Sequence, residues 1–114
     1  MPAKPKRGEI VLVPFPFADL TATKVRPALV MSSVLYHRTE PDLILVAINS
    51  HLKARPGATD YLLQDWEQAG LLAPSLVKVS LATLEPGLIR HRLGRLTARD
   101  LREVESKLRL ALEL

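Results

Sequence analysis

The stretch that decides the fold is Leu43-Ile44-Leu45-Val46-Ala47-Ile48, the most apolar run in the chain. It is short, with Pro41-Asp42 before it and Asn49-Ser50 after it. An apolar run of this length between turn-forming residues is typical of a strand that is buried on both faces. We therefore predict a central strand over residues 43–48, with a functional site able to open at its polar end.

Shorter segments on both sides of this run have the β-branched or alternating pattern of strands. They are residues 9–13, 26–30, 59–63 and 74–80, of which 59–63 is a candidate edge strand. Pro27 donates no backbone hydrogen bond, so we expect it at the first position of its strand. Several short strands at close spacing indicate a mainly β chain that forms a small barrel or a strongly bent sheet.

The pattern changes to a helical period after residue 96. Thr97 has an acid, Asp100, three residues on, which resembles a capping box at a helix N-terminus. The apolar stripe that follows consists of Leu101, Val104, Leu108, Ala111 and Leu112. Glu103 and Glu105 each precede a basic residue by four positions, as in the ion pairs of an exposed helix face. These features predict a C-terminal helix that covers the sheet with its apolar side.

The length of 114 residues is that of a single domain. Residues 1–7 are rich in proline and basic side chains, so we expect a flexible basic arm there and one domain over residues 8–114. No apolar run approaches the roughly 20 residues that span a bilayer, and prolines interrupt the only segment that could act as an export signal. With no cysteine in the chain, we expect a soluble cytoplasmic protein without membrane contact.

The residue inventory disfavours several kinds of catalytic site. The three histidines, His37, His51 and His91, lack the paired spacing of metal ligands. The five glycines are scattered without a phosphate-binding loop, and Ser32-Ser33 lies outside the G-x-S-x-G setting of hydrolases. We therefore expect no metal and no cofactor. The net charge of +4 favours a polyanionic partner such as a nucleic acid.

A set of segments spread along the chain carries a family pattern. They are Arg7-Gly8-Glu9-Ile10-Val11-Leu12-Val13, Arg26-Pro27-Ala28-Leu29-Val30, Val46-Ala47-Ile48-Asn49-Ser50, Ser75-Leu76-Val77-Lys78-Val79, Ala82-Thr83-Leu84-Glu85 and Leu93-Gly94-Arg95-Leu96. In their order and spacing they resemble the toxins of the MazF/PemK type. The resemblance covers nearly the whole chain.

The resemblance implies a fold, an activity and partners. The fold would be an SH3-like barrel with a C-terminal helix, assembled as a homodimer. The activity would be that of a metal-independent endoribonuclease, which cleaves single-stranded RNA such as mRNA at a short preferred sequence. The 2′-hydroxyl of the RNA would attack the adjacent phosphorus. A cognate acidic antitoxin would hold the toxin inactive.

The same resemblance implies Arg26 as the main catalytic residue. Its planar guanidinium can bind two phosphoryl oxygens at once and stabilise the charge that develops during cleavage. The family usually has a threonine where this chain has Asn49-Ser50. Either the Asn49 amide supplies the hydrogen bond to the phosphate, or Ser50 takes that role from the next position. We expect Ser50 to act, with Asn49 in support.

The remaining site residues also follow from the resemblance. RNA contacts are expected from Asp19, Thr21, Lys24, Lys78 and Ser80, and Glu9 is expected to orient Arg26. Leu20-Thr21 stands where several members carry His-Glu, and Ser80 stands where many carry an acid, so no general base is assigned. The departures at Asn49 and Ser80 leave a second function open, that of a catalytically silent barrel that binds RNA or inhibits a protein target such as a topoisomerase.

Overall fold

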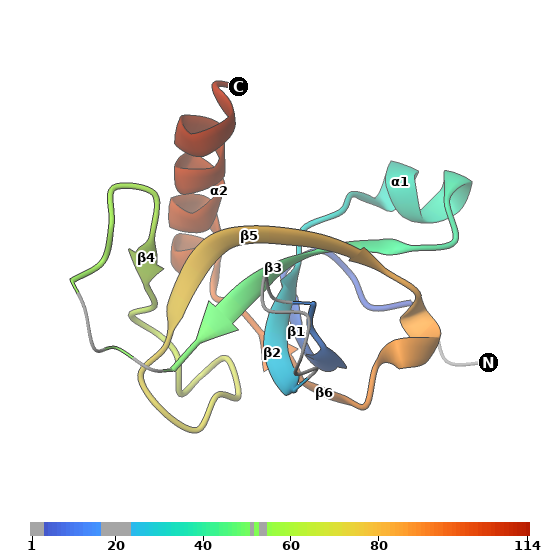
Figure 1. Cartoon of the computed structure of the whole chain (residues 1–114), viewed down its shortest axis with the longest axis horizontal. Coiled ribbons are helices and arrows are strands. Elements are labelled where there is room, and N and C mark those ends of the chain that lie inside the picture. Colours follow the sequence, from blue (N-terminus) through green and yellow to red (C-terminus); the bar gives the residue numbers. More distant parts are fainter. Residues whose placement is uncertain (1–3, 17–23, 51, 53–54) are drawn as a thin grey trace.

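The computed structural model describes residues 4–16, 24–50, 52 and 55–114. Its elements, labelled in Figure 1, are β1 (Glu9–Pro14), β2 (Val25–Val30), α1 (Val34–Thr39), β3 (Leu43–Asn49), β4 (Tyr61–Leu62), β5 (Leu76–Leu84), the short 3-10 helix η1 (Pro86–Leu88), β6 (His91–Arg95) and α2 (Ala98–Leu112). The segment 59–63 thus contains the edge strand β4, and the predicted C-terminal helix is α2.

All strand pairs are antiparallel, and the order across the sheet is β4-β5-β3-β2-β1-β6. β3 pairs with β2 on one side and β5 on the other, which confirms the central strand predicted over residues 43–48. The β3–β5 register shifts between Val46 and Ala47, and Figure 1 shows β5 as an arch. An irregularity of this kind bends a strand. The sheet curls into a half-barrel closed by a C-terminal helix, so the expected mainly β, SH3-like fold class is confirmed.

The two faces of the sheet bury separate apolar clusters, because successive residues of a strand point to opposite faces. The first cluster includes Ile10, Leu29, Val46, Ile48 and, from α2, Val104. The second cluster includes Val11, Val13, Ala28, Val30 and Ala47, and Ala82 and Leu84 of β5 pack against it. Figure 1 shows α2 against one side of the sheet. Side chains that share the second face at the strand ends are therefore not covered by α2.

Some elements differ from their predicted form. Residues 74–80 contain only the first part of β5, which continues to Leu84 through the register shift. Pro27 is the third residue of β2 and not the first. The position tolerates proline because the β2–β3 pairs begin only at Ala28, so β1 is the one strand paired with Pro27. The helix α1 and the strand β6 have no counterpart among the predicted elements.

A buried carboxylate ties the start of α2 to the chain around β4. Asp100 is fully buried and accepts hydrogen bonds from the Tyr61 hydroxyl at 2.6 Å and from the backbone N–H groups of Gln64 and Asp65 at 3.2 and 2.8 Å. The Thr97 hydroxyl donates to the Asp65 carboxylate at 2.6 Å and makes no cap hydrogen bond. The predicted capping box is therefore wrong, since both side chains bind the segment 61–65 instead of the helix N-terminus.

The apolar stripe of α2 contacts the sheet as far as Leu108. Leu101, Val104 and Leu108 pack in or against the first cluster, whereas Ala111 and Leu112 are exposed. Lys107 donates to the carbonyl of Ala58 at 3.1 Å, so it serves a distant segment and not the expected i, i+4 pair. In the part of the chain that the structure describes, neither α-helix has the length and apolar character needed to cross a membrane.

The described part of the basic N-terminal segment is anchored to the domain. Lys4 Nζ donates to two carbonyls at the end of α1, at 3.0 and 2.8 Å. Arg7 forms an ion pair with Glu105 of α2, and its Nε donates to the carbonyl of Met31 at 3.2 Å. Lys4 and Arg7 thus contact the domain, which differs from the flexible arm expected over residues 1–7; residues 1–3 lie outside the described residues.

Replacing Asp100 tests the role of the buried carboxylate. We expect Asp100→Ala to lower the free energy of unfolding by about 2–4 kcal/mol, because each donor left buried without an acceptor costs about 1–3 kcal/mol. Urea denaturation at neutral pH measures the change. Arg102→Ala, on the exposed side of α2, is the matched control and should stay within about 0.5 kcal/mol of the parent protein. Equal unfolding midpoints for Asp100→Ala and the control would contradict the assignment.

Asp65 makes the stability of this junction depend on pH. Hydrogen bonds from Arg99 and Thr97 lower the pKa of the Asp65 carboxyl from its ordinary 3.8 to about 2. A depressed carboxyl pKa gives a stabilisation that is complete above the unfolded-state pKa and is lost as the pH falls through the folded-state pKa. Arg99→Ala should therefore lower the melting temperature at pH 6, and the deficit should shrink between pH 4 and pH 2. A deficit that stays constant down to pH 2 would exclude this linkage.

Candidate functional site

Arg26 lies near the end of the sheet where Asn49 ends β3. The β2–β3 pairs Ala28–Ala47, Leu29–Val46 and Val30–Leu45 define the register. These pairs end at Ala28–Ala47, and Arg26 and Asn49 each lie two residues further towards the same end of the sheet. By the alternation of side chains along a strand, both belong to the face of Ala28 and Ala47, which is the face that α2 leaves uncovered. Arg26 and Asn49 therefore lie at one rim of the sheet, just beyond the last β2–β3 pair.

The structure favours Asn49 over Ser50 as the partner of Arg26. Asn49 is the last residue of β3, is partly buried and lines a cavity. Ser50 follows the strand and is exposed. Of these two residues, Asn49 lines the cavity and Ser50 does not.

The cavity next to Asn49 has a volume of about 370 Å³. Its walls come from β3, β4, β5 and the segment between β3 and β4. The lining residues are Asn49, Leu52, Arg55, Pro56, Asp60, Leu62, Leu76 and Lys78. Leu76 of β5 is paired with Asn49 of β3 and with Leu62 of β4, so these three wall residues lie side by side across the sheet. The cavity therefore joins the rim that carries Arg26 and Asn49.

Asp60 is a wall residue that the sequence did not single out. Its side chain is 11% exposed, and its Oδ1 lies 3.8 Å from Nζ of Lys78, whose side chain is 58% exposed. Its Oδ2 accepts a hydrogen bond from the backbone N–H of Gly57 at 2.8 Å. The sequence gives little indication of a site here, because a glycine followed three residues later by an aspartate is common in turns. Only the pairing of β4 with β5 brings this turn to Lys78.

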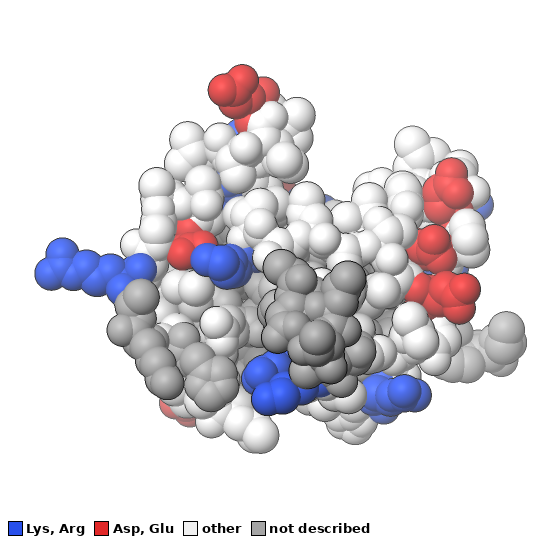
Figure 2. Space-filling view, viewed as in Figure 1, with Lys and Arg blue, Asp and Glu red and all other residues white. Residues whose placement is uncertain are grey.

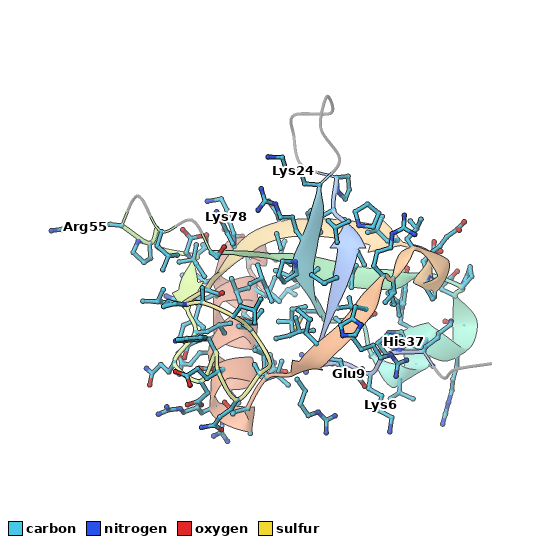
Figure 3. All side chains as sticks on the ribbon, turned by 90° about the horizontal axis from the view of Figure 1, so that it is seen from below. Lys6, Glu9, Lys24, His37, Arg55 and Lys78 are labelled. Carbon is cyan, nitrogen blue, oxygen red and sulfur yellow. The ribbon has the colours of Figure 1, made fainter. Side chains whose placement is uncertain are left out.

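Basic side chains surround this rim. Lys24 is exposed directly before β2, and Lys78 lies on β5 opposite Ala47. Figure 3 shows Lys24, Lys78 and Arg55 along one side of the molecule. On the face seen in Figure 2, basic side chains lie at the left and along the lower part, while acidic ones form a group at the right and also occur singly at the top, at the lower left and beside a basic one at the left. The cavity thus opens where several cations lie near one carboxylate, that of Asp60.

Two of the predicted site residues lie elsewhere. Glu9 starts β1 and is 4.0 Å from Arg92, whereas the β1 residue that pairs with Arg26 is Val13. Four residues of strand span about 13 Å, so the backbone positions of Glu9 and Arg26 lie far apart along β1 and β2. Figure 3 shows Glu9 on the other side from Lys24. Ser80 falls at the register shift of β5, between the paired residues Lys78 and Leu81, and does not line the cavity.

Asp19 and Thr21 lie outside the described residues, as does His51. Of the other two histidines, His91 is exposed on β6, and His37 of α1 is hydrogen bonded to the buried Ser32. Burial and the nearby Lys4 lower the pKa of His37. Figure 3 places His37 far from Lys24 and Lys78. Among the described residues, no group of three or more His, Cys, Asp or Glu side chains could hold a metal ion.

Comparison with known proteins places the chain in a described family. Residues 6–112 match the family of PemK-like, MazF-like toxins of type II toxin-antitoxin systems. No curated protein matches the sequence.

Solved structures with the same fold cover almost the whole chain. MazF from Deinococcus radiodurans has a TM-score of 0.77 and 23% identity, over 99% of this chain and 100% of its own. An endoribonuclease in complex with its cognate antitoxin, from a mycobacterial species, has a TM-score of 0.76 and 21% identity, over 96% of each chain. A further mycobacterial endoribonuclease has a TM-score of 0.75 and 20% identity, over 98% of this chain and 94% of its own. These similarities establish the fold.

Proposed function

The chain belongs to the family of PemK-like, MazF-like toxins of type II toxin-antitoxin systems, and on this premise we propose that it is an endoribonuclease that cleaves single-stranded RNA without a metal ion. The observation that carries the proposal is that Arg26 and Asn49 lie just beyond the last β2–β3 pair, at a rim that also carries Lys24 and Lys78 and adjoins a cavity. The catalytic unit is the single domain of residues 8–114.

The reaction suits the side chains at this rim. The 2′-hydroxyl of RNA attacks the adjacent phosphorus, the bond from phosphorus to the 5′ oxygen breaks, and a cyclic phosphate and a 5′-hydroxyl are formed. The protein has to align the attack and stabilise the added negative charge on the phosphoryl oxygens. Hydrogen-bond donors held in place can do both.

Arg26 stabilises the developing charge with its guanidinium, which donates to two oxygens in a fixed geometry. It acts electrostatically, because a group with a pKa above about 12 releases its proton reluctantly. Asn49 donates its amide N–H to a phosphoryl oxygen and takes the place of the usual threonine. Lys24 binds the flanking backbone, and Lys78, together with Asp19 and Thr21 in the loop that leads to Arg26, adds contacts to the RNA.

A cognate antitoxin is the proposed inhibitor. One structure with the same fold is an endoribonuclease in complex with its cognate antitoxin, and another is a MazE–MazF complex from Deinococcus radiodurans. For this chain, an acidic segment would compete with RNA for the cations around Arg26. The homodimer implied by the family resemblance belongs to the same proposal.

Cleavage of a long single-stranded RNA in excess EDTA tests the activity. The parent protein should cleave, and Arg26→Ala should slow cleavage about 100- to 1000-fold, as expected when a donor to the developing charge is removed. Arg38→Ala, an exposed arginine on α1, is the matched control and should retain the parent rate. Circular dichroism and melting temperature establish that each variant is folded. RNA that stays intact with the parent protein, with and without added divalent ions, would refute the activity.

A comparison of two alanine variants tests which residue assists Arg26. Asn49→Ala should slow cleavage about 10- to 100-fold, because a hydrogen bond to a charged group contributes about 1.5–3 kcal/mol. Ser50→Ala should stay close to the parent rate. Single-turnover cleavage of one fluorescent RNA measures both. The reverse order of the two rates would assign the role to Ser50.

A further inference from the structure

A carboxylate inside an RNA-binding cavity needs a physical reason. Asp60 faces the same cavity as Asn49 and Lys78, on a surface otherwise suited to phosphate. Its negative charge repels phosphate groups at short range. The part of the cavity next to Asp60 is therefore suited to a part of the RNA that carries no negative charge and donates hydrogen bonds.

The size and walls of the cavity fit one nucleobase. Its volume of about 370 Å³ lies near the lower end of the roughly 300–1,000 Å³ of small-molecule sites. Leu62 and Leu76, on the paired strands β4 and β5, provide apolar walls. Apolar side chains of this kind pack against the faces of a base that has left the stack.

Asp60 retains the capacity to accept a further hydrogen bond. A carboxylate has about four acceptor sites on its two oxygens. Gly57 N–H uses one of these on Oδ2, and Lys78 Nζ lies 3.8 Å from Oδ1, longer than a hydrogen bond. The two side chains thus present an acceptor and a donor next to each other at the cavity wall.

We propose that this cavity binds a nucleobase that carries an amino group, namely adenine, cytosine or guanine, and that Asp60 selects it against uracil. The amino group donates to Oδ1 of Asp60, and Lys78 donates to the acceptor beside it on the base edge. Uracil has no amino group, and the carbonyls on either side of its one N–H are repelled by the carboxylate. The inference rests on the proposed function, whose substrate it specifies.

The selected base lies next to the bond that is cut. Asn49 lines the cavity and lies, like Arg26, just beyond the last β2–β3 pair at the same rim. A base in the cavity therefore belongs to a nucleotide beside the phosphate that Arg26 binds. The preference should appear at one fixed position adjacent to the cleavage site.

Sequencing the products from a random single-stranded RNA pool tests the inference. With the parent protein, one position next to the cut should be depleted of uracil. Asp60→Asn keeps an oxygen that can accept from Gly57 N–H, but it replaces the oxygen that faces the base by an amide donor. The uracil content at that position should therefore rise about tenfold. A change of this size lies within the roughly 1–3 kcal/mol that one base contact contributes to discrimination. Glu67→Gln, an exposed acid away from the cavity, is the matched control and should leave the preference unchanged. An unchanged preference in folded Asp60→Asn would overturn the inference.

Changing the RNA instead of the protein covers the case in which Asp60→Asn does not fold. The parent protein is titrated with short 2′-O-methyl oligouridines, which it cannot cleave, carrying one A, C or G at the centre. Each should bind about tenfold more tightly than the all-uridine strand, and a purine lacking the amino group should lose this gain. Equal affinities would overturn the inference. Because this binding measurement needs no cleavage, it distinguishes a failure of the base preference from a failure of the proposed ribonuclease activity.

Discussion

The register of β3 between β2 and β5 is the constraint on which the site depends. It pairs Asn49 with Leu76 of β5 and brings the end of β3 to the rim where Arg26 lies on β2. Side chains alternate between faces along a strand, so a slip by one residue would move the entire set to the other face. Leu45, Val46, Ala47 and Ile48 are all buried, so a slip that moved Asn49 into the place of Ile48 would bury its polar side chain in the core. The apolar run of residues 43–48 thus determines where the rim with Arg26 and Asn49 forms.

The wall of the cavity depends on a second, longer-range connection. β4 has only two residues and pairs with β5 alone, so strand pairing by itself holds it weakly. Asp100 compensates, because it binds the Tyr61 hydroxyl and the backbone just after β4. Burial and this hydrogen bond raise the pKa of Tyr61, which keeps the donor protonated. Through Asp100, the C-terminal helix α2 therefore positions Leu62 and the turn that carries Asp60, although α2 itself does not line the cavity.

Elements that a short stretch of sequence defines could be predicted, and features made by contacts between distant residues could not. The apolar run of β3 and the apolar stripe of α2 are each recognisable within a few residues, and the family resemblance pointed to Arg26. Asp100 was mistaken for a capping residue because its spacing from Thr97 is the same in both cases, whereas its actual partners lie 35–39 residues away. The choice between Asn49 and Ser50 depends on the residue at which β3 ends, and no pattern marks that end. Asp60 reaches the cavity only because β4 folds back on β5.

Two aspartates form ion pairs of different geometry. The pair made by Asp65 is tight and structural, whereas the pair made by Asp60 is loose, so another partner can replace its lysine. Asp65 holds Arg99 through two hydrogen bonds, at 2.8 and 2.7 Å, and its pKa is lowered by them. Asp60 and Lys78 are 3.8 Å apart with the lysine exposed, and a pair of this kind contributes about 0–1 kcal/mol. Replacing so weak a contact by a base costs little, whereas a phosphate brought to the same carboxylate meets repulsion at full strength. A loose ion pair at the wall of a basic cavity therefore discriminates between the parts of an RNA chain, which a tight one would not.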